Sequence, residues 1–349
     1  MTALNMHTDN AAVQYLACGA LKNLAIGNAV NKEEIAAAGG INRILAAMGA
    51  HPHVPYMQYF ASGALWALAA DNKNNTHCII KAGAIVRIAA AMDMHHEHQG
   101  VQEQASQALW QLAAHTEGEI KMGSSSTLAA GIESIITAMY AYRGSKAVQY
   151  FACWSLWTLA RNTDNRIAIR AAGGIESIIA VMDMYRNDPE IQHFACRGLE
   201  QLAVEEFAHA STLSISHDAD LPTVMSEGGI ESIIATMDLH MGDASVVRSA
   251  CIALSAVALD KGSQVKMRSH GAIEHLIRAT ELHMGDASVQ IAAIGALVNL
   301  AADIGNLVQI ASNGGIECLL AAMQAHQALS NVQVIACQAL EPYTLDPRP

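Results

Sequence analysis

The stretch VQYLACGALKNLA, residues 13–25, decides the fold, because variants of it recur along the whole chain. Val13, Ala17, Ala20, Leu21 and Leu24 follow one another at helical spacings, so they share one face of a helix of about 14 residues. The later copies span residues 57–69, 101–113, 148–160, 191–203, 246–258, 289–301 and, less regularly, 332–344. A recurring amphipathic helix predicts a repeat protein.

A second phrase, GGIE or a variant of it, alternates with the first. The first phrase advances by 44, 44, 47, 43, 55, 43 and 43 residues, and the second follows the same series wherever both exist. The isoleucine of the second phrase is Ile41, Ile85, Ile132, Ile175, Ile230, Ile273 and Ile316. The repeat lengths vary along the chain, and both phrases follow the same variation. Each repeat length therefore corresponds to one structural unit.

One unit can be followed through residues 162–185. The polar break at 162–165 is suited to helix capping. A short helix is predicted over 166–172, and the glycine pair at 173–174 ends it, because glycine readily takes the left-handed conformation. A middle helix then runs from Ile175 to about Tyr185, and the long helix of the first phrase follows. Three helices in ~43 residues are typical of a stacking unit in a solenoid.

This pattern resembles the armadillo repeat family. The resemblance rests on the glycine pair after a short helix, then IxxII, then VQxxAxxALxxLA, and it extends from about residue 28 to residue 344. The related HEAT repeats lack the short first helix and its glycine. The resemblance implies an all-α, right-handed solenoid of about seven full three-helix units after an N-terminal partial unit.

The expected boundaries follow from the two phrases. We expect a partial unit at 1–27 that holds a third helix, and a tail at 345–349. The seven full units are expected at 28–70, 71–114, 115–161, 162–204, 205–259, 260–302 and 303–344. The long step places an inserted loop at 205–221, either a variable surface loop or a loop that grips a partner or is phosphorylated. Pro342 is expected to end the last helix.

Composition excludes several classes of function. The net charge is −12 and no basic run occurs, whereas nucleic-acid binding needs clustered cations, so no nucleic-acid partner is expected. No apolar stretch reaches the ~18 residues that would span a bilayer, and the N-terminus lacks a signal peptide or myristoylation pattern. No membrane insertion and no cofactor are predicted.

The seven cysteines indicate a reducing compartment. Five of them occupy one site of the first phrase, where a thiol acts as a small core hydrophobe. These five are Cys18, Cys153, Cys196, Cys251 and Cys337. Because the count is odd and no pair spacing occurs, we predict an intracellular protein, in the cytoplasm or the nucleus.

The candidate binding surface comes from the resemblance, since armadillo proteins hold peptides or partner helices in a concave groove lined by the third helix. If Ala17, Leu21 and Leu24 face the core, the sites of Leu16, Gly19 and Asn23 face away from it. Later units place large aromatic residues at these sites, and exposed aromatic residues mark interaction surfaces. The groove candidates are Phe60, Phe151, Trp154 and Phe194, with Arg197 beside them.

Three further tryptophans, Trp66, Trp110 and Trp157, occupy the site equivalent to Lys22. This site lies about 90° from the centre of the groove face, so the rings either pack between helices or contact a ligand. The Trp and Asn ladder by which importin alpha holds basic localisation signals is absent, and so is a basic groove like that of β-catenin. Nuclear-import recognition is therefore not expected.

Sixteen histidines raise the question of a metal site. Most stand at the end of the middle helix, where a histidine can bond the last carbonyls of its own helix. Adjacent units lie ~10 Å apart and zinc ligands ~2.0–2.1 Å from the ion, so this series cannot share one metal. The run from His95 to His98 remains a weak candidate, and neither catalytic nor metal residues are assigned.

The glutamine at the second residue of the first phrase recurs in seven of the eight copies, and we expect it to bond a neighbouring loop. The sequence predicts a non-catalytic scaffold or adaptor that binds a peptide, a helix or a protein surface in the groove. The alternative is a structural subunit bound through its edge or its uncapped N-terminal end. A metal protein or an enzyme is the third hypothesis. It ranks last because no phosphate loop, HExxH, CxxC or nucleophile elbow occurs.

Overall fold

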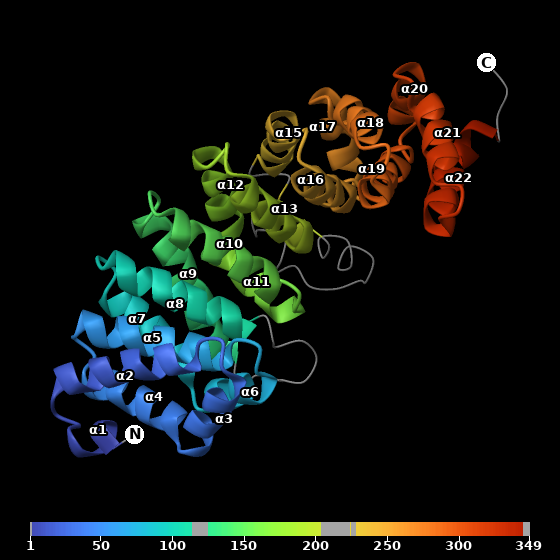
Figure 1. The fold of residues 1–349 in the computed structure, drawn as a ribbon. Helices are drawn as coiled ribbons and strands as arrows, with labels where there is room; N and C mark the ends of the chain where they lie inside the picture. The colour runs from blue at the N-terminus through green and yellow to red at the C-terminus, as the bar shows by residue number, and fades with distance from the viewer. Residues whose placement is uncertain (1, 114–124, 204–223, 225–227, 345–349) are drawn as a thin grey trace. The chain divides into compact units, whose positions relative to one another are not determined.

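The computed structural model describes residues 2–113, 125–203, 224 and 228–344, and all of the regular elements in these ranges are α-helices. Short, middle and long helices alternate along the chain, and each set stacks on its counterparts, so the fold is an all-α solenoid (Figure 1). The chain divides into two compact units, residues 1–174 and 175–349, called unit 1 and unit 2 below. The predicted loop at 205–221 and the tail at 345–349 lie outside the described residues.

In unit 1 the long helices are α2 (Ala11–Ala25), α5 (Pro55–Ala69), α8 (Gln99–Ala113) and α10 (Lys146–Leu159). The middle helices are α1 (Thr2–Met6), α4 (Gly40–Ala50), α7 (Ala84–Met94) and α9 (Ser125–Ala141). The short helices are α3 (Ala29–Ala37), α6 (Lys73–Lys81) and α11 (Thr163–Ala171). Each long helix packs against the next one in sequence order.

In unit 2 the long helices are α13 (Pro189–Ala203), α16 (Ala244–Val257), α19 (Ala287–Leu300) and α22 (Ser330–Thr344). The middle helices are α12 (Gly174–Met184), α15 (Gly229–Leu239), α18 (Ala272–Leu282) and α21 (Gly315–Ala325). The short helices are α17 (Lys261–Ser269) and α20 (Ile304–Ser312). Here too, successive long helices pack on one another.

Local chemistry starts and stops these helices as the phrases predict. The residue before each described short helix accepts a hydrogen bond from the backbone N–H three residues later, which caps the helix. These caps are Asn28, Asn72, Asn162, Asp260 and Asp303. Between the short and the middle helix a glycine takes φ of 77–83°, as at Gly39 and Gly314. Only glycine adopts this conformation without steric cost.

The third full repeat, expected at residues 115–161, departs from the predicted pattern. α9 runs without a break through Gly131, where a short helix and a middle helix separated by a turn were expected. Ala130 occupies the site of the left-handed glycines in the other units. An alanine resists the left-handed conformation, so the helix continues.

The expectation that Pro342 ends the last helix is wrong, because α22 continues through it to Thr344. Proline removes one backbone N–H, and only two residues of the helix follow it. The hydroxyl of Tyr343 donates to the carbonyl of Leu307 at 3.1 Å and so holds this turn against α20. Burial raises the pKa of Tyr343 to about 12.

The recurring glutamine joins the long helix to the middle helix before it. In seven repeats the side-chain amide of this glutamine donates to two carbonyl oxygens, ten and seven residues earlier, at 2.7–3.1 Å. Gln149, for example, bonds the carbonyls of Met139 and Tyr142. These carbonyls belong to the last turn of the middle helix, which lacks intrahelical partners. A structural hydrogen bond was predicted, but its acceptors lie at the end of the middle helix and not in a separate loop.

The histidines at the end of the middle helices act differently from the prediction. The backbone N–H of each histidine bonds the last turn of its own helix, but the five rings described below do not. Instead, Nε2 donates to a carbonyl of the preceding repeat at 2.6–2.8 Å. The pairs are His51 with Thr8, His95 with Pro52, His240 with Arg186, His283 with Met241, and His326 with Met284. The glutamine already satisfies the last turn, so the ring can fix the register between neighbouring repeats.

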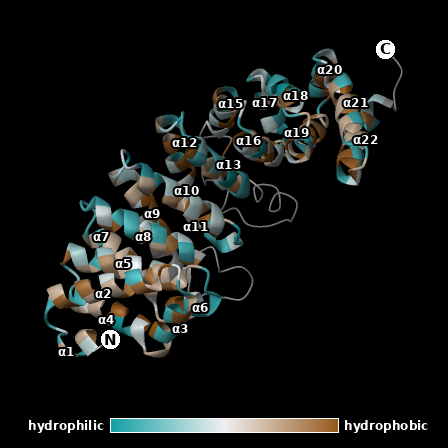
Figure 2. Ribbon diagram, viewed as in Figure 1, coloured by the Kyte–Doolittle hydropathy of each residue, from teal (hydrophilic) through white to brown (hydrophobic). Residues whose placement is uncertain are grey.

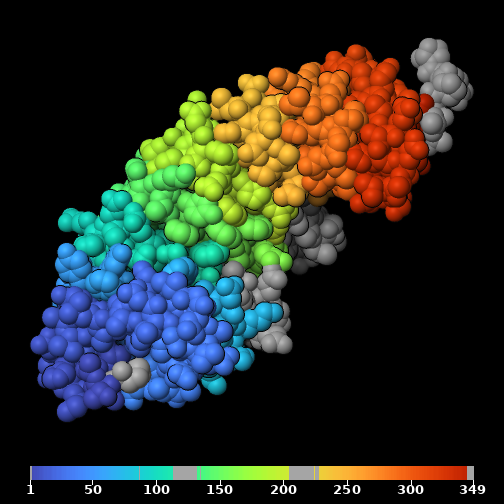
Figure 3. Space-filling view, viewed as in Figure 1, coloured from blue at the N-terminus to red at the C-terminus, as the bar shows by residue number. Residues whose placement is uncertain are grey.

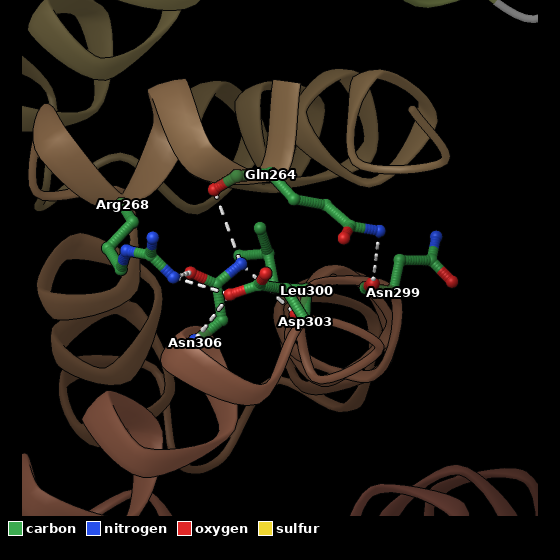
Figure 4. Close-up of polar contacts among 6 residues, drawn as sticks. All are labelled: Gln264, Arg268, Asn299, Leu300, Asp303 and Asn306. Carbon is green, nitrogen blue, oxygen red and sulfur yellow. Dashed lines mark hydrogen bonds and ion pairs between the residues drawn. The ribbon is translucent and has the colours of Figure 1, made fainter. Parts of the chain in front are cut away.

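Polar contacts also join successive short helices. In unit 2 the guanidinium of Arg268 on α17 pairs with the carboxylate of Asp303, the cap of α20 (Figure 4). Asn306 donates from Nδ2 to the carbonyls of Leu300 at 3.1 Å and Gln264 at 3.2 Å. The backbone N–H of Asn306, together with Arg268, holds the pKa of Asp303 below its usual range despite some burial. The stack is therefore held by polar contacts as well as by the apolar core.

The core runs through the stacked long and middle helices, and hydrophobic residues are interspersed with polar ones along them (Figure 2). Four cysteines of the recurring site, Cys18, Cys153, Cys196 and Cys251, are fully buried as predicted. Cys337 is exposed, which corrects its expected core position. No described helix packs beyond α22 on that side.

Candidate binding surface

The long helices of unit 1 form the candidate surface, and one packing rule sets its shape. The side chain at the position equivalent to Leu16 lies over the position equivalent to Gly19 on the preceding long helix. A Cβ atom built on Gly19 would lie 3.0 Å from Cδ1 of Phe60, and one on Gly63 would lie 2.6 Å from Oε1 of Gln104. The glycines thus make room for the large side chains of the next helix.

A first group of aromatic rings covers α2 and α5. The rings of Tyr15 and Phe60 stack with centroids 5.9 Å apart and planes 12° apart. Tyr59 meets Phe60 edge-on at 5.0 Å, and Tyr56 lies 5.9 Å from Tyr15. Tyr56 is 60% exposed, so the group reaches the surface. These four rings are called the tyrosine cluster below.

A lysine connects the tyrosine cluster with the next helix. Nζ of Lys22 donates to Oε1 of Gln104 at 2.7 Å and lies 5.6 Å from the centre of the Tyr59 ring. Burial lowers the pKa of Lys22. A cation over an aromatic face is stabilised by the charge distribution of the ring. The surface between α2, α5 and α8 is therefore polar and aromatic at once.

A second group, called the tryptophan cluster, joins α8 and α10. The centroids of the Trp110 and Trp154 rings are 4.1 Å apart, and Phe151 lies 6.0 Å from Trp110. Tyr150 meets Phe151 and Trp154 edge-on, at 5.2 and 5.6 Å. Four rings from two adjacent helices thus form one continuous aromatic patch.

The predicted groove aromatics are less exposed than the sequence suggested. Phe60, Phe151, Trp154 and Phe194 are all half-buried rather than freely exposed. In unit 1 this follows because each long helix packs on the one before it. Trp66, Trp110 and Trp157 are half-buried as well. The indole Nε1 atoms of Trp66 and Trp110 are buried and bond no described residue. These two indole N–H groups therefore point into the protein.

In unit 2 the candidates Phe194 and Arg197 lie on α13. Phe194 meets the His193 ring at 4.9 Å, and Nη1 of Arg197 pairs with Oε2 of Glu200 at 2.7 Å. Nδ1 of His193 lies 2.7 Å from the Ser249 hydroxyl on α16, and burial lowers the pKa of His193. The charge of Arg197 is therefore balanced within its own helix.

Sequence reasoning missed the tyrosines, which contribute as many rings as the predicted residues. Tyr15, Tyr59 and Tyr150 occupy the same site, directly after the recurring glutamine. That recurrence in three of the eight copies is the signal that would have found them.

The structure places the histidine run from 95 to 98 against the backbone. Nε2 of His95 bonds the carbonyl of Pro52, and Nδ1 of His98 accepts from the Val101 N–H at 3.2 Å. Within the described ranges, no three His, Cys, Asp or Glu side chains are placed to hold a metal ion. An open pocket of about 450 Å³ lies between α4 and α7, bordered by Met48, Arg87 and Met94.

Comparison with known proteins identifies the fold. No family model and no curated protein matches the chain. A solved structure from work on a phosphorylation switch in the cadherin–beta-catenin interaction superposes with a TM-score of 0.66, at 13% identity over 98% of this chain and 74% of that one. The fold is armadillo-like. A crystal structure of an engineered protein also matches, with a TM-score of 0.57 at 21% identity over 73% of this chain and 94% of that one.

The armadillo-like fold accounts for the three-helix repeats, whose successive long helices pack on one another within each unit. In the space-filling view the colours within each unit follow one another in sequence order (Figure 3). Among the helices that the structure describes, none combines the length and apolarity needed to cross a membrane. At these identities the comparison shows the fold alone. The aromatic clusters therefore have to be interpreted from their own geometry.

Proposed function

We propose that this protein is a non-catalytic scaffold or adaptor that binds a peptide, a helix or a protein surface along its long helices. The tryptophan cluster of unit 1 forms the centre of the binding surface, and the tyrosine cluster extends it. Phe194 and Arg197 form a separate contact on unit 2. We further propose an intracellular protein, since none of the seven cysteines, all within the described ranges, is paired in a disulfide, as a reducing compartment requires.

One observation carries the proposal, the 4.1 Å contact between the Trp110 and Trp154 rings on adjacent helices. With Tyr150 and Phe151 they form a patch that is rigid, because each ring is held by the others. Rigid aromatic residues lose little conformational entropy on binding and are enriched at binding hot spots. Partner side chains would be buried against these rings, and Gln107, half-buried on the same helix as Trp110, would bond the partner's backbone.

The test compares captured partners of the wild type and of the double variant Phe151→Ala, Trp154→Ala. Partners found by proximity labelling are retested by titration, and affinity should fall at least about tenfold, as expected for hot-spot residues. Tyr140→Ala is the matched control, because Tyr140 is an aromatic residue of α9 that is 44% exposed outside both clusters. If the double variant retains every partner, the proposal is wrong.

A second candidate is a structural subunit held through the α2 surface, and the exposure of two leucines on α2 favours it. Leu24 is 54% exposed, whereas the leucines at the equivalent position of later repeats are at most 6% exposed, namely Leu68, Leu112, Leu159, Leu202 and Leu300. Leu16 on the same helix is 62% exposed. A protein surface covering α2 would bury both. The pair Leu16→Glu, Leu24→Glu should abolish assembly in this case and leave binding to the tryptophan cluster unchanged.

A further inference from the structure

The middle helices of unit 2 carry a row of exposed apolar residues that the proposed function does not use. α12, α15 and α18 each end with an acidic residue followed by a large apolar one: Asp183 and Met184, Asp238 and Leu239, Glu281 and Leu282. Met184, Leu239 and Leu282 are 52%, 53% and 58% exposed. Three such residues at one site of consecutive repeats are called the edge row below.

The edge row is a property of unit 2. The equivalent residues of unit 1 are Met6, Ala50, Met94 and Ala141, where large and small side chains alternate. Only unit 2 combines three consecutive large apolar residues with an acidic neighbour at each step. Large apolar side chains gathered on a surface mark an interaction site.

Histidine bonds fix the spacing of the edge row. His240 and His283 directly follow Leu239 and Leu282, and each ring is bonded to the preceding repeat. The His240 ring bonds the carbonyl of Arg186 at 2.6 Å, and the His283 ring bonds that of Met241 at 2.7 Å. The row is therefore held at the spacing of packed helices, which is ~10 Å.

This spacing matches an α-helix that runs along the row. Seven residues of an α-helix rise about 10.5 Å, so a side chain at every seventh position would meet each repeat in turn. When every seventh residue of the partner helix contacts the edge row, the residues next to those contacts on the partner helix lie over the acidic residues of this chain. A partner strand would place same-face side chains at intervals of about 7 Å, which do not match.

The charges around the row define the partner's chemistry. Asp183, Asp238 and Glu281 are exposed and stand beside the apolar residues, and the whole chain carries a net charge of −12. Asp183 pairs with Arg186 at 3.0 Å and Asp238 with Arg278 at 3.9 Å. These side chains are 57–63% exposed, and pairs of such exposure contribute little stability. A cation of a partner can therefore take the place of Arg186 and Arg278 beside these carboxylates.

We propose that the edge row docks a basic amphipathic helix of a partner protein. The partner helix carries apolar residues at every seventh position and lysine or arginine beside them. Met184, Leu239 and Leu282 pack against its apolar side, and Asp183, Asp238 and Glu281 attract its cations. The row lies on the middle helices, so this docking is independent of the long-helix surface.

The test uses the full chain and a designed probe peptide of three heptads, with leucine at every seventh position and lysine at the flanking ones. The control peptide has the same composition with the leucines shifted out of that spacing. Binding is measured by fluorescence anisotropy at low and at physiological ionic strength. The variants are Leu239→Asp and Leu239→Ser, and the matched control is Val334→Asp, because Val334 on α22 is 57% exposed outside the row.

The wild type and Val334→Asp should bind the heptad peptide equally, and both Leu239 variants at least about tenfold more weakly. The control peptide should bind about tenfold more weakly than the heptad peptide, and salt should weaken the heptad complex. Equal binding of both peptides would mean charge attraction alone and would overturn the proposal. Unchanged binding by both Leu239 variants would overturn it too, and so would self-association of the chain through the row. Phe151→Ala with Trp154→Ala should leave peptide binding intact, which separates this result from the proposed function.

Discussion

The side-chain amide of Gln149 donates a hydrogen bond to the carbonyl oxygen of Met139 at 3.0 Å. The same amide reaches the Tyr142 carbonyl at 2.9 Å, so one side chain satisfies two carbonyls at the end of α9. Gln149 is fully buried, and no water can take over these bonds without opening the stack. This relationship recurs in every described long helix except α16, which has Val247 at the site.

Replacing this glutamine should destabilise the fold. Gln149→Met keeps the volume of the side chain and leaves two buried carbonyls unsatisfied, which should cost about 2–4 kcal/mol of unfolding free energy. Urea denaturation followed by circular dichroism measures the change. Gln338→Met is the control, since Gln338 is exposed on α22, and it should alter stability by less than about 0.5 kcal/mol. Equal effects of both variants would refute the structural role of Gln149.

A side chain at the left-handed glycines that precede the middle helices should destabilise the fold. Gly271 has φ of 77°, so Gly271→Ala forces alanine into the left-handed region and should cost about 1–2 kcal/mol. Gly242 lies in a loop of the same unit without such a φ, and a Cβ atom added there would meet nothing within 4 Å, so Gly242→Ala should be neutral or slightly stabilising. Thermal unfolding distinguishes the two variants, and a neutral Gly271→Ala would contradict the assigned turn.

Acid should weaken the cap of α19. The hydroxyl of Ser288 and the backbone N–H groups of Val289 and Ser288 hold the pKa of Asp286 below its usual range despite slight burial. The folded pKa is therefore lower than the unfolded pKa of about 3.9, so the stabilisation is present above about pH 4 and is lost as the pH falls through the folded pKa.

Asp286→Asn should accordingly melt at a lower temperature than the wild type at pH 7, and the difference should vanish once the pH has fallen through the folded pKa of Asp286. Asparagine remains a good cap, so helix α19 itself should persist. Glu34→Gln on α3 serves as the control, because Glu34 is exposed. A difference in melting temperature that does not change with pH would show that the carboxylate charge has no part in the cap.

The cysteines should separate into two classes by reactivity. Burial raises the pKa of Cys18 and of Cys153 to about 12, so almost no thiolate forms at pH 8. Cys78 and Cys337 are exposed. Iodoacetamide should therefore add two groups to the native protein and seven to the denatured one, as read by intact mass. Rapid labelling of Cys153 in the native protein would show that α10 does not pack as described.

The sequence was a sufficient guide to the helices because their signals are local. The steps between phrases located the long and middle helices to within a few residues, and the polar break at 162–165 located the cap Asn162. The failures are also local in origin. Ala130 in place of glycine lets α9 continue, and Pro342 stands so near the end of α22 that the helix loses little.

The candidate surface was only partly predictable. The wheel placed Phe60, Phe151 and Trp154 on the outward face, but it could not show that each ring lies against the preceding helix. Gly19 lies beneath Phe60, and this contact crosses 41 residues of sequence. The edge row was missed for the same reason, since the exposure of Leu239 depends on what packs beside α15.

By itself, the sequence determined that the protein is a helical solenoid of armadillo-like repeats, because helical spacing, caps and left-handed glycines act within a few residues. The tertiary structure alone decided that the histidines bond the preceding repeat, that Cys337 is exposed, and that Trp110 meets Trp154. The histidine bonds and the tryptophan contact depend on how two helices some 40 residues apart in sequence pack together, and such packing leaves no periodic mark in either helix. Cys337 is exposed because no described helix packs beyond α22 on that side.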